Sequence, residues 1–339
     1  MINPQHKNKI EDLISRKEPT VILSHLNPDG DSVGASLGLA LFLIKNEVPV
    51  SIIIPNEIPD FLRWLPGFEI IKVFSKNRKQ CYYDLEEASV IFFVDFNDPK
   101  RLGDGLDSAV NSSAYKILLD HHQNPSDFSD ITISEPWRGS AGEMVYILIE
   151  ELKLSQYIDK QIATCLYVAI MTDTGNFRYG SSYAEVFRIA GSLVDKGINK
   201  DEIYSNVYDS YSLSRMKLMG YCMSEKMKVL DSYHTAYMGI SMDELQRFNY
   251  QTGDTEGFVN LPFSVKGIRV SVLFIEKKDH VKVSLRSKGN FSVDQFAKKY
   301  YKGGGHVNAA GGESSLSLEE TLKQFEQIIA KHASEIIDH

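Results

Sequence analysis

Cysteine is scarce in this chain. The 339 residues include three, Cys81, Cys165 and Cys222, and no pair has Cys-x-x-Cys spacing. Disulfide frameworks and zinc–thiolate sites need several closely placed cysteines, so neither is indicated. Long apolar runs are also missing, and the first ten residues lack the basic-then-apolar order of a signal peptide. We therefore expect a cytoplasmic protein.

Internal repeats, low-complexity tracts and a Pro/Gly/Ser-rich linker are absent as well. With 43% hydrophobic and 11% aromatic residues, the chain is long enough for two domains. Its net charge of −8 belongs to residues 1–231, because residues 232–339 contain 13 Lys/Arg and 13 Asp/Glu. Residues 261–312 hold ten Lys/Arg against three Asp/Glu, which suits a small anionic substrate better than a long nucleic acid.

The first half of the chain alternates short apolar runs with amphipathic stretches. TVILSH at 20–25, a helical pattern at 32–46 and VPVSIII at 48–54 predict a β-α-β unit. Further strands are expected at 69–74, 89–95 and 115–120. We predict a mainly parallel sheet flanked by helices, with functional residues at the carboxyl ends of its strands.

Helices are expected to follow this sheet. Ser140 and Glu143 have the Ser-x-x-Glu spacing of a capping box that begins a helix through Leu152, and a second helix is expected near 156–171. Residues 183–226 also have a helical pattern. Beyond about residue 229, separate β runs, a helix at 293–300, a glycine-rich turn and a closing helix from Leu318 predict a smaller α/β domain. The expected organisation is an N-terminal domain at 1–190, a helical connector at 191–229 and a C-terminal domain at 230–339.

Acidic and imidazole side chains gather where apolar segments end. The loop at 24–32 follows a predicted strand and enters a helix, and its Pro28 and Gly30 let the backbone turn so that side chains converge. Two other strands end in Asp95 and in Asp-His-His, and an apolar helix ends in an aspartate. The candidate metal ligands are His25, Asp29, Asp31, Asp95, His121 and Asp173.

Each segment has a plainer interpretation when taken alone. Asp29-Gly30-Asp31 has the composition of a turn and helix cap, and an aspartate after a strand is usually a turn former. A single histidine is usually a surface or satisfied core residue. Four such ends in one α/β domain favour a shared site, because parallel strands bring their carboxyl ends to one crevice. Mixed imidazole and carboxylate ligands suit Mn²⁺, Zn²⁺, Fe²⁺ or Co²⁺.

These motifs, in this order, resemble the DHH phosphoesterase superfamily. The resemblance rests on His-x-x-Pro-Asp-x-Asp from His25, the strand-end Asp95, Asp120-His121-His122 and Thr172-Asp173-Thr174-Gly175. The segment 303–311, Gly-Gly-Gly-His-Val-Asn-Ala-Ala-Gly, resembles the signature of the partner domain, DHHA1. The resemblance implies a DHH domain, the helical connector and a DHHA1 domain.

The resemblance also implies two divalent metal ions. His25, Asp29 and Asp95 would hold one, and Asp31, Asp95, His121 and Asp173 the other, with Asp95 as the bridge. His122 would donate to the scissile phosphate, and Asp120 would orient the histidines. Mn²⁺ is the metal expected from the family, with Mg²⁺, Co²⁺ and Fe²⁺ as alternatives. Relatives more often have a small or hydroxyl residue where this chain has Phe96, so the contacts around Phe96 and Asn97 stay open.

Substrate contacts are expected mainly from the second domain. Gly303, Gly304 and Gly305 would offer backbone N–H groups to phosphate, with His306 beside them. Arg286 and Ser287, in a predicted strand, would face the substrate, and relatives bind the non-reacting phosphate at the position of Arg286. Arg178, after the Thr-Asp-Thr-Gly turn, is a further candidate. A glycine run also fits a flexible turn, and Arg286 alone fits a solvated charge on a hairpin.

The most similar branch of the family implies a metal-dependent phosphoesterase. It would degrade dinucleotides and slightly longer oligoribonucleotides to 5′-mononucleotides, and convert 3′-phosphoadenosine 5′-phosphate (pAp) to AMP. Hydrolysis of cyclic di-AMP or of its linear product pApA is the alternative. Further alternatives are a RecJ-like single-strand exonuclease, a DHH-type inorganic pyrophosphatase and a non-catalytic nucleotide-binding protein.

The expected partners follow from that function. They are short oligoribonucleotides and small nucleotides, bound by a monomer or homodimer. Long double-stranded nucleic acid and membranes are not expected as partners.

Overall fold

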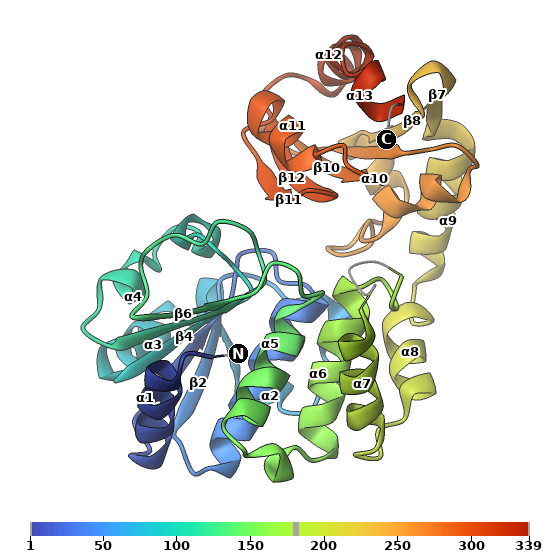
Figure 1. Ribbon diagram of the computed structural model, residues 1–339. Helices are drawn as coiled ribbons and strands as arrows, with labels where there is room; N and C mark the ends of the chain where they lie inside the picture. The colour runs from blue at the N-terminus through green and yellow to red at the C-terminus, as the bar shows by residue number, and fades with distance from the viewer. Residues whose placement is uncertain (1, 179–182, 338–339) are drawn as a thin grey trace. The chain divides into compact units, whose positions relative to one another are not determined.

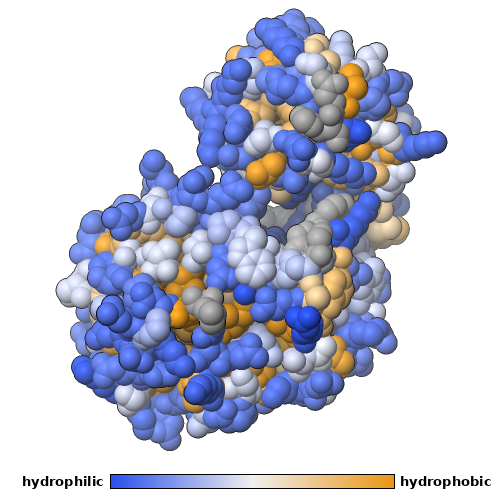
Figure 2. Space-filling model, in the orientation of Figure 1, coloured by the Kyte–Doolittle hydropathy of each residue, from blue (hydrophilic) through white to orange (hydrophobic). Residues whose placement is uncertain are grey.

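The computed structural model describes residues 2–178 and 183–337. The chain folds into two compact units, unit 1 at residues 1–210 and unit 2 at residues 211–339 (Figure 1). The division falls inside the segment 191–229, so the helices of the expected connector are shared between the units. Hydrophilic side chains cover most of the face of each unit seen in Figure 2. In the part of the chain that the structure describes, no helix has the length and apolar character needed to span a membrane.

Unit 1 contains a six-stranded parallel sheet, which confirms the predicted α/β class. Its strand order is β3-β2-β1-β4-β5-β6, and every neighbouring pair is parallel. The strands are β1 (Thr20–Leu23), β2 (Val50–Ile54), β3 (Ile71–Val73), β4 (Val90–Val94), β5 (Tyr115–Asp120) and β6 (Ile131–Ser134). The sequence prediction missed β6. Because the chain runs outward through β2 and β3 and then returns beside β1 with β4, the strand order reverses between β1 and β4.

Helices cover both faces of this sheet. Alternate strand residues such as Ile22, Ile52 and Phe92 pack with one group of helices, and Leu23, Ile53 and Phe93 pack with the other. The first group comprises α1 (Pro4–Ser15), α2 (Gly30–Lys45), α5 (Ala141–Glu151), α6 (Lys160–Asp173), α7 (Ala184–Val194) and α8 (Lys200–Tyr208). The second comprises α3 (Phe74–Glu87) and α4 (Asp107–Asn111). The expected helices at 32–46, from Ser140 and near 156–171 correspond to α2, α5 and α6.

A row of glycines lets α2 lie against α6, beside which α5 and α7 are seen in Figure 1. Gly30, Gly34 and Gly38 recur every four residues along α2 and so share one face. A Cβ on Gly34 would lie 2.6 Å from the carbonyl oxygen of Cys165, and a Cβ on Gly38 would lie 2.5 Å from a methyl group of Leu166. Both contacts are too short for carbon. The small residues that the sequence placed in this helix therefore set its distance from α6.

Replacing Gly34 with alanine should destabilise unit 1. The new Cβ meets backbone of α6, which cannot move aside as a side-chain tip would, and overpacking of this kind costs about 1–3 kcal/mol. The matched control is Gly191→Ala in α7, where a Cβ meets nothing within 4 Å. Alanine is more favourable than glycine inside a helix by about 1 kcal/mol, so this change should not destabilise the protein. Thermal unfolding followed by circular dichroism should show a lower Tm for Gly34→Ala and an unchanged or higher Tm for Gly191→Ala. Equal Tm values would contradict the close packing of α2 and α6.

Unit 2 has a mixed six-stranded sheet of order β11-β12-β10-β9-β8-β7. The β8–β9 pair is parallel and the other pairs are antiparallel. The strands are β7 (Lys228–Leu230), β8 (Thr235–Ile240), β9 (Val270–Glu276), β10 (Val281–Ser287), β11 (Gly304–His306) and β12 (Ala309–Ser314). The helices are α9 (Leu213–Tyr221), α10 (Met242–Arg247), α11 (Val293–Tyr300), α12 (Leu318–Ala330) and α13 (Ala333–Ile337).

The glycine-rich segment, for which the sequence indicated a turn, forms a β-hairpin. Gly304, Gly305 and His306 form β11 and pair with Gly311, Ala310 and Ala309 of β12. The N–H of Gly303 donates to the carbonyl of Ala297, and that of Gly305 donates to Asp294. A Cβ on Gly303 would lie 1.9 Å from the carbonyl oxygen of Gly311. The glycines are needed for close approach of two strands, two of their three N–H groups are used within the fold, and the contact of this segment with phosphate stays a prediction.

Candidate metal centre

The loop after β1 contributes two side chains to the site, His25 and Asp29. The Nδ1 of His25 is 2.9 Å from the carbonyl oxygen of Leu26, so Nδ1 donates and Nε2 is left as the ligand nitrogen. Asp29 caps α2, because its Oδ1 accepts from the N–H of Ser32 at 3.0 Å. Its other oxygen, Oδ2, lies 3.9 Å from the Nε2 of His25. The plainer interpretation of Asp29 as a cap is correct, and it leaves one oxygen for a metal.

Asp95 follows β4 in a backbone conformation that side chains rarely adopt. Its φ of 68° is left-handed, which costs on the order of 1 kcal/mol for a residue with a Cβ. The turn aims the two carboxylate oxygens in different directions. Oδ2 lies 3.2 Å from the Nε2 of His25, and Oδ1 lies 3.4 Å from the Nε2 of His121. Asp95 is 2% exposed, so it joins two groups of side chains from a buried position.

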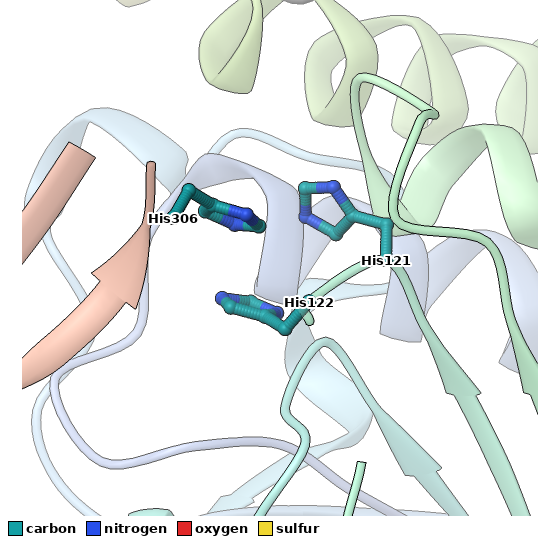
Figure 3. Close-up of side chains that lie close together, drawn as sticks. All are labelled: His121, His122 and His306. Atoms are coloured by element: carbon teal, nitrogen blue, oxygen red, sulfur yellow. The ribbon is translucent and has the colours of Figure 1, made fainter. Parts of the chain in front are cut away.

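His121 and His122 follow β5, and Figure 3 shows their two rings. The ring centroids are 5.0 Å apart, with planes inclined at 62°. The Nδ1 of His121 faces the carbonyl oxygen of Arg138 at 3.2 Å, which leaves Nε2 toward the acids. That Nε2 lies 3.6 Å from Asp31 and 3.5 Å from Asp173.

The six predicted ligands thus form two groups joined by Asp95. One group is His25, Asp29 and Asp95, and the other is Asp31, His121 and Asp173; within each group the ligand atoms lie within 4.8 Å of one another. The first group lies at the carboxyl ends of β1 and β4, where the strand order reverses, which is the usual ligand position in an open α/β sheet. The second is completed by the first turn of α2 and the last residue of α6.

Buried negative charge dominates this centre. Burial raises the pKa of Asp31, and the charges of Asp95 and Asp173 raise it further, well above its ordinary value. Burial also opposes ionisation of Asp95, yet hydrogen bonds from His121 and His25 hold the pKa of Asp95 well below its usual range. The pKa of His121 is lowered by burial, but its hydrogen bond to Asp95 and the charges of Asp173 and Asp31 raise it well above its ordinary value.

The donor set fits divalent metal ions. Four carboxylates and two imidazoles converge, and the four negative charges balance two dications. Carboxylate oxygens with imidazole nitrogens suit Mn²⁺, Zn²⁺, Fe²⁺ or Co²⁺, whereas the three cysteines are free and buried elsewhere. Hydrogen bonds from the histidines and from backbone N–H groups offset part of this charge, and bound dications would offset the rest. The geometry of the ligands and their charge therefore both favour divalent cations.

His122 is held between a carboxylate and a guanidinium. Its Nδ1 is 2.7 Å from Asp120, as expected for a residue that orients the ring, and its Nε2 is 2.7 Å from the Nη1 of Arg101. Because a guanidinium can only donate, His122 here has a proton on Nδ1 and accepts at Nε2. Burial lowers the pKa of His122, which Asp120 opposes and Arg101 reinforces. Arg101 was not among the predicted site residues, although it follows the strand-end Asp95 by six positions.

Two further charged residues beside the ligands were missed. Arg138 and Glu143 are 7% and 0% exposed, and both follow β6. Ser140 caps α5 as predicted, since its Oγ accepts from the N–H of Glu143. Glu143 does not complete the capping box, because its carboxylate accepts from Gly139 and Tyr183 instead. Had β6 been recognised, charged residues after a strand end would have singled out this segment too.

The proposed substrate residues lie partly in unit 2. Arg286 is half-buried in β10, with its Nη1 donating to the carbonyl of Leu285. Ser287 is buried, donates to the carbonyl of Phe291 and accepts from Asn308, so its hydroxyl is used within the fold, and its contact with substrate stays a prediction. His306 is half-buried in β11. Arg178 is exposed in unit 1, after the turn that follows α6.

Comparison with protein families matches both parts of the chain. Residues 19–170 match the DHH family, N-terminal domain, and residues 231–331 match the DHHA1 domain. A Thermus thermophilus protein named bifunctional oligoribonuclease and PAP phosphatase NrnA is 31% identical over 90% of this chain and 87% of its own. The cyclic-di-AMP phosphodiesterase PdeA of Listeria monocytogenes is 26% identical over 93% of this chain, which corresponds to 48% of PdeA.

Solved structures share the fold. An exopolyphosphatase-related protein from Bacteroides fragilis is 41% identical, with a TM-score of 0.95 over 99% of this chain and 98% of its own. RecJ from Thermus thermophilus in complex with Mn²⁺ is 14% identical, with a TM-score of 0.58 over 99% of this chain and 56% of its own. At that identity the likeness to RecJ concerns the fold alone.

The Asp95→Asn variant should bind metal ions more weakly, because Asp95 serves both ligand groups. Asparagine has nearly the same size and tolerates the left-handed backbone, but it removes the charge and one ligand oxygen. Isothermal titration with Mn²⁺ should show two ions bound by the wild-type protein, and fewer ions or an affinity weaker by at least about 100-fold in the variant. Asp104→Asn, at an exposed position, is the control and should bind as wild type does. Two ions at wild-type affinity in Asp95→Asn would refute the assignment.

Proposed function

Because the chain belongs to the DHH family, we propose that it is a metal-dependent phosphoesterase that degrades short oligoribonucleotides to 5′-mononucleotides and converts pAp to AMP. The observation that supports it most directly is Asp95, which turns one oxygen toward each of two ligand groups. Phosphate ester hydrolysis is a common use of paired metals joined by a carboxylate. The name of the Thermus thermophilus relative, similar over nearly its whole length, supports the two substrates.

The six ligands are proposed to hold two ions, with Mn²⁺ as the preferred metal. When bound, such ions supply an activated water and neutralise charge on the phosphoryl oxygens. His25, Asp29 and Asp95 hold the first position, and Asp31, Asp95, His121 and Asp173 hold the second.

Beside these ligands, His122 and Arg101 are proposed to contact the scissile phosphate. Asp120 fixes the ring of His122 through Nδ1, and the Arg101 guanidinium already lies 2.7 Å from Nε2. A phosphoryl oxygen would accept from Arg101, which is permanently charged and a strong donor to phosphate. His122 would donate from Nε2 only after taking a second proton. Arg101 can therefore donate to phosphate without a change of protonation. His122 accepts from Arg101 at Nε2, so it would contact phosphate only after gaining a proton there.

Unit 2 is proposed to bind the end of the substrate that does not react. Arg286 and His306 lie on neighbouring parts of one sheet, since Arg286 pairs with Ala309 of β12 and His306 pairs with that same residue from β11. A guanidinium and an imidazole placed in this way suit a terminal phosphate. Arg178 in unit 1 is a further proposed phosphate contact.

Cyclic di-AMP or pApA hydrolysis is the second candidate function, favoured by the match to PdeA. The chain spans about half of that relative, and the match covers both the DHH and the DHHA1 regions. The same ligands and the same chemistry serve both functions. Substrate choice must be measured.

Rates should fall as the RNA substrate lengthens. Purified protein with Mn²⁺ should be assayed on RNA chains of two, three, five, seven and about twenty-four nucleotides, and in parallel on pAp, pApA and cyclic di-AMP. We expect kcat/KM to be highest for dinucleotides, with release of AMP from pAp and slow turnover of cyclic di-AMP. The reason is that a small basic surface neutralises few phosphates.

The Asp95→Asn protein is the blank for every substrate in this panel. Equal or faster cleavage of the longest RNA would refute the preference for short chains. A cyclic di-AMP rate above that of all dinucleotides would replace the first function with the second.

A further inference from the structure

The segment 138–142, between β6 and α5, contacts two of the proposed ligands at once. The carbonyl oxygen of Arg138 lies 3.2 Å from the Nδ1 of His121. The N–H groups of Ala141 and Gly142 donate to the two oxygens of Asp31, at 2.6 and 2.9 Å. One stretch of backbone thereby holds both carboxylate oxygens of Asp31 and the Nδ1 of His121. These contacts decide where the Asp31 oxygens and the His121 Nε2 point.

The contact with Asp31 uses the first turn of a helix. Ser140 caps α5 and satisfies the N–H of Glu143, while Asp31 satisfies the N–H groups of the first two helical residues. The positive end of the helix dipole therefore faces a buried carboxylate.

The side chain of Glu143 anchors the same segment. The side chain of Glu143 is fully buried. Its Oε1 accepts from the N–H of Gly139 at 3.2 Å, and its Oε2 accepts from the hydroxyl of Tyr183 at 2.5 Å. The Tyr183 hydroxyl also accepts from the Gly139 N–H, at 3.0 Å. A single backbone N–H is thus held by two side chains from α5 and from the residue before α7.

The Arg138 side chain adds a second anchor. Its guanidinium is 2.6 Å from Glu135, 3.2 Å from Glu185 and 3.7 Å from Glu143. Because Arg138 is 7% exposed, these carboxylates balance a largely buried charge. The backbone carbonyl that meets His121 belongs to this same residue. The ion pairs of the Arg138 side chain therefore restrain the residue whose carbonyl oxygen meets His121.

We propose that Glu143 is a positioning residue of the metal centre, acting through the segment 138–142 to aim His121 and Asp31. A carboxylate is expensive to bury, and α5 does not need this one for its cap, which Ser140 supplies. What Glu143 does fix is the backbone on which two ligands rest. The inference depends on the proposed function, since it assumes that metal ions bind at His121 and Asp31. Tyr183 supports the same segment, because its hydroxyl donates to Glu143 and accepts from the N–H of Gly139.

The Glu143→Gln variant tests this role. Glutamine keeps the size of the side chain and one acceptor for Gly139, but it presents an N–H₂ group to Tyr183 and Arg138. We expect Mn²⁺ affinity, measured by isothermal titration of the full chain, to fall 10- to 100-fold, as is typical when the partner of a ligand is lost. Glu150→Gln, at an exposed position of the same helix, should bind as wild type does.

A spectroscopic measurement separates positioning from general destabilisation. With Co²⁺ in place of Mn²⁺, the visible absorption of the protein reports the coordination of the ion. We expect this spectrum to change in Glu143→Gln and to stay unchanged in Glu150→Gln, at temperatures where circular dichroism shows all proteins folded. Loss of stability alone would leave the spectrum of the folded protein as it is.

Tyr183→Phe keeps the inference testable if Glu143→Gln fails to fold. It removes the hydroxyl that bridges Glu143 and Gly139 at a half-buried position, so we expect a smaller fall in Mn²⁺ affinity, about 3- to 10-fold. Wild-type affinity and an unchanged Co²⁺ spectrum in both variants, or in Tyr183→Phe if only that variant folds, would overturn the role of Glu143. Absence of Mn²⁺ binding by the wild-type protein would instead overturn the proposed function itself.

Discussion

The repulsion among buried carboxylates is the constraint around which unit 1 is organised. Asp31 and Asp95 are both nearly inaccessible to water, and Asp173 and Asp29 lie close by. Such charges are tolerated only where hydrogen bonds, helix ends and cations offset them. The N-terminus of α5 faces Asp31, and two histidines face Asp95. The close packing of α2 on α6 brings two of these acids together from helices that are far apart in the chain.

Much of the fold and the site could be predicted from the sequence, because the relevant signals are local. Apolar runs that end in Asp95 or in Asp120-His121-His122 mark strand ends, and a parallel sheet gathers such ends on one edge. The backbone that holds the ligands was not predictable in this way. Neither the Arg138 carbonyl nor the N–H of Ala141 has a side-chain signature, and β6, which places them, is short and only partly apolar.

Two signals gave the wrong structure for identifiable reasons. Ser140 and Glu143 have the spacing of a capping box, but the buried carboxylate of Glu143 accepts from Tyr183 and Gly139 instead. The glycines at 303–305 indicated a turn, because a sequence does not distinguish a glycine that gives the backbone freedom from one that leaves room for a neighbouring strand. Here the neighbour is β12, at a distance that excludes any side chain on Gly303. In both cases tertiary contacts decided between alternatives that are equal at the local level.

The backbone of Asp95 restricts which amino acids evolution can place there. A left-handed conformation is accessible mainly to glycine, asparagine and aspartate. Joining two cations requires a carboxylate, which only aspartate and glutamate offer. Aspartate meets both conditions at the lowest conformational cost: asparagine keeps the backbone but loses the charge, and glutamate keeps the charge but is less favourable in the left-handed backbone that Glu47 also adopts.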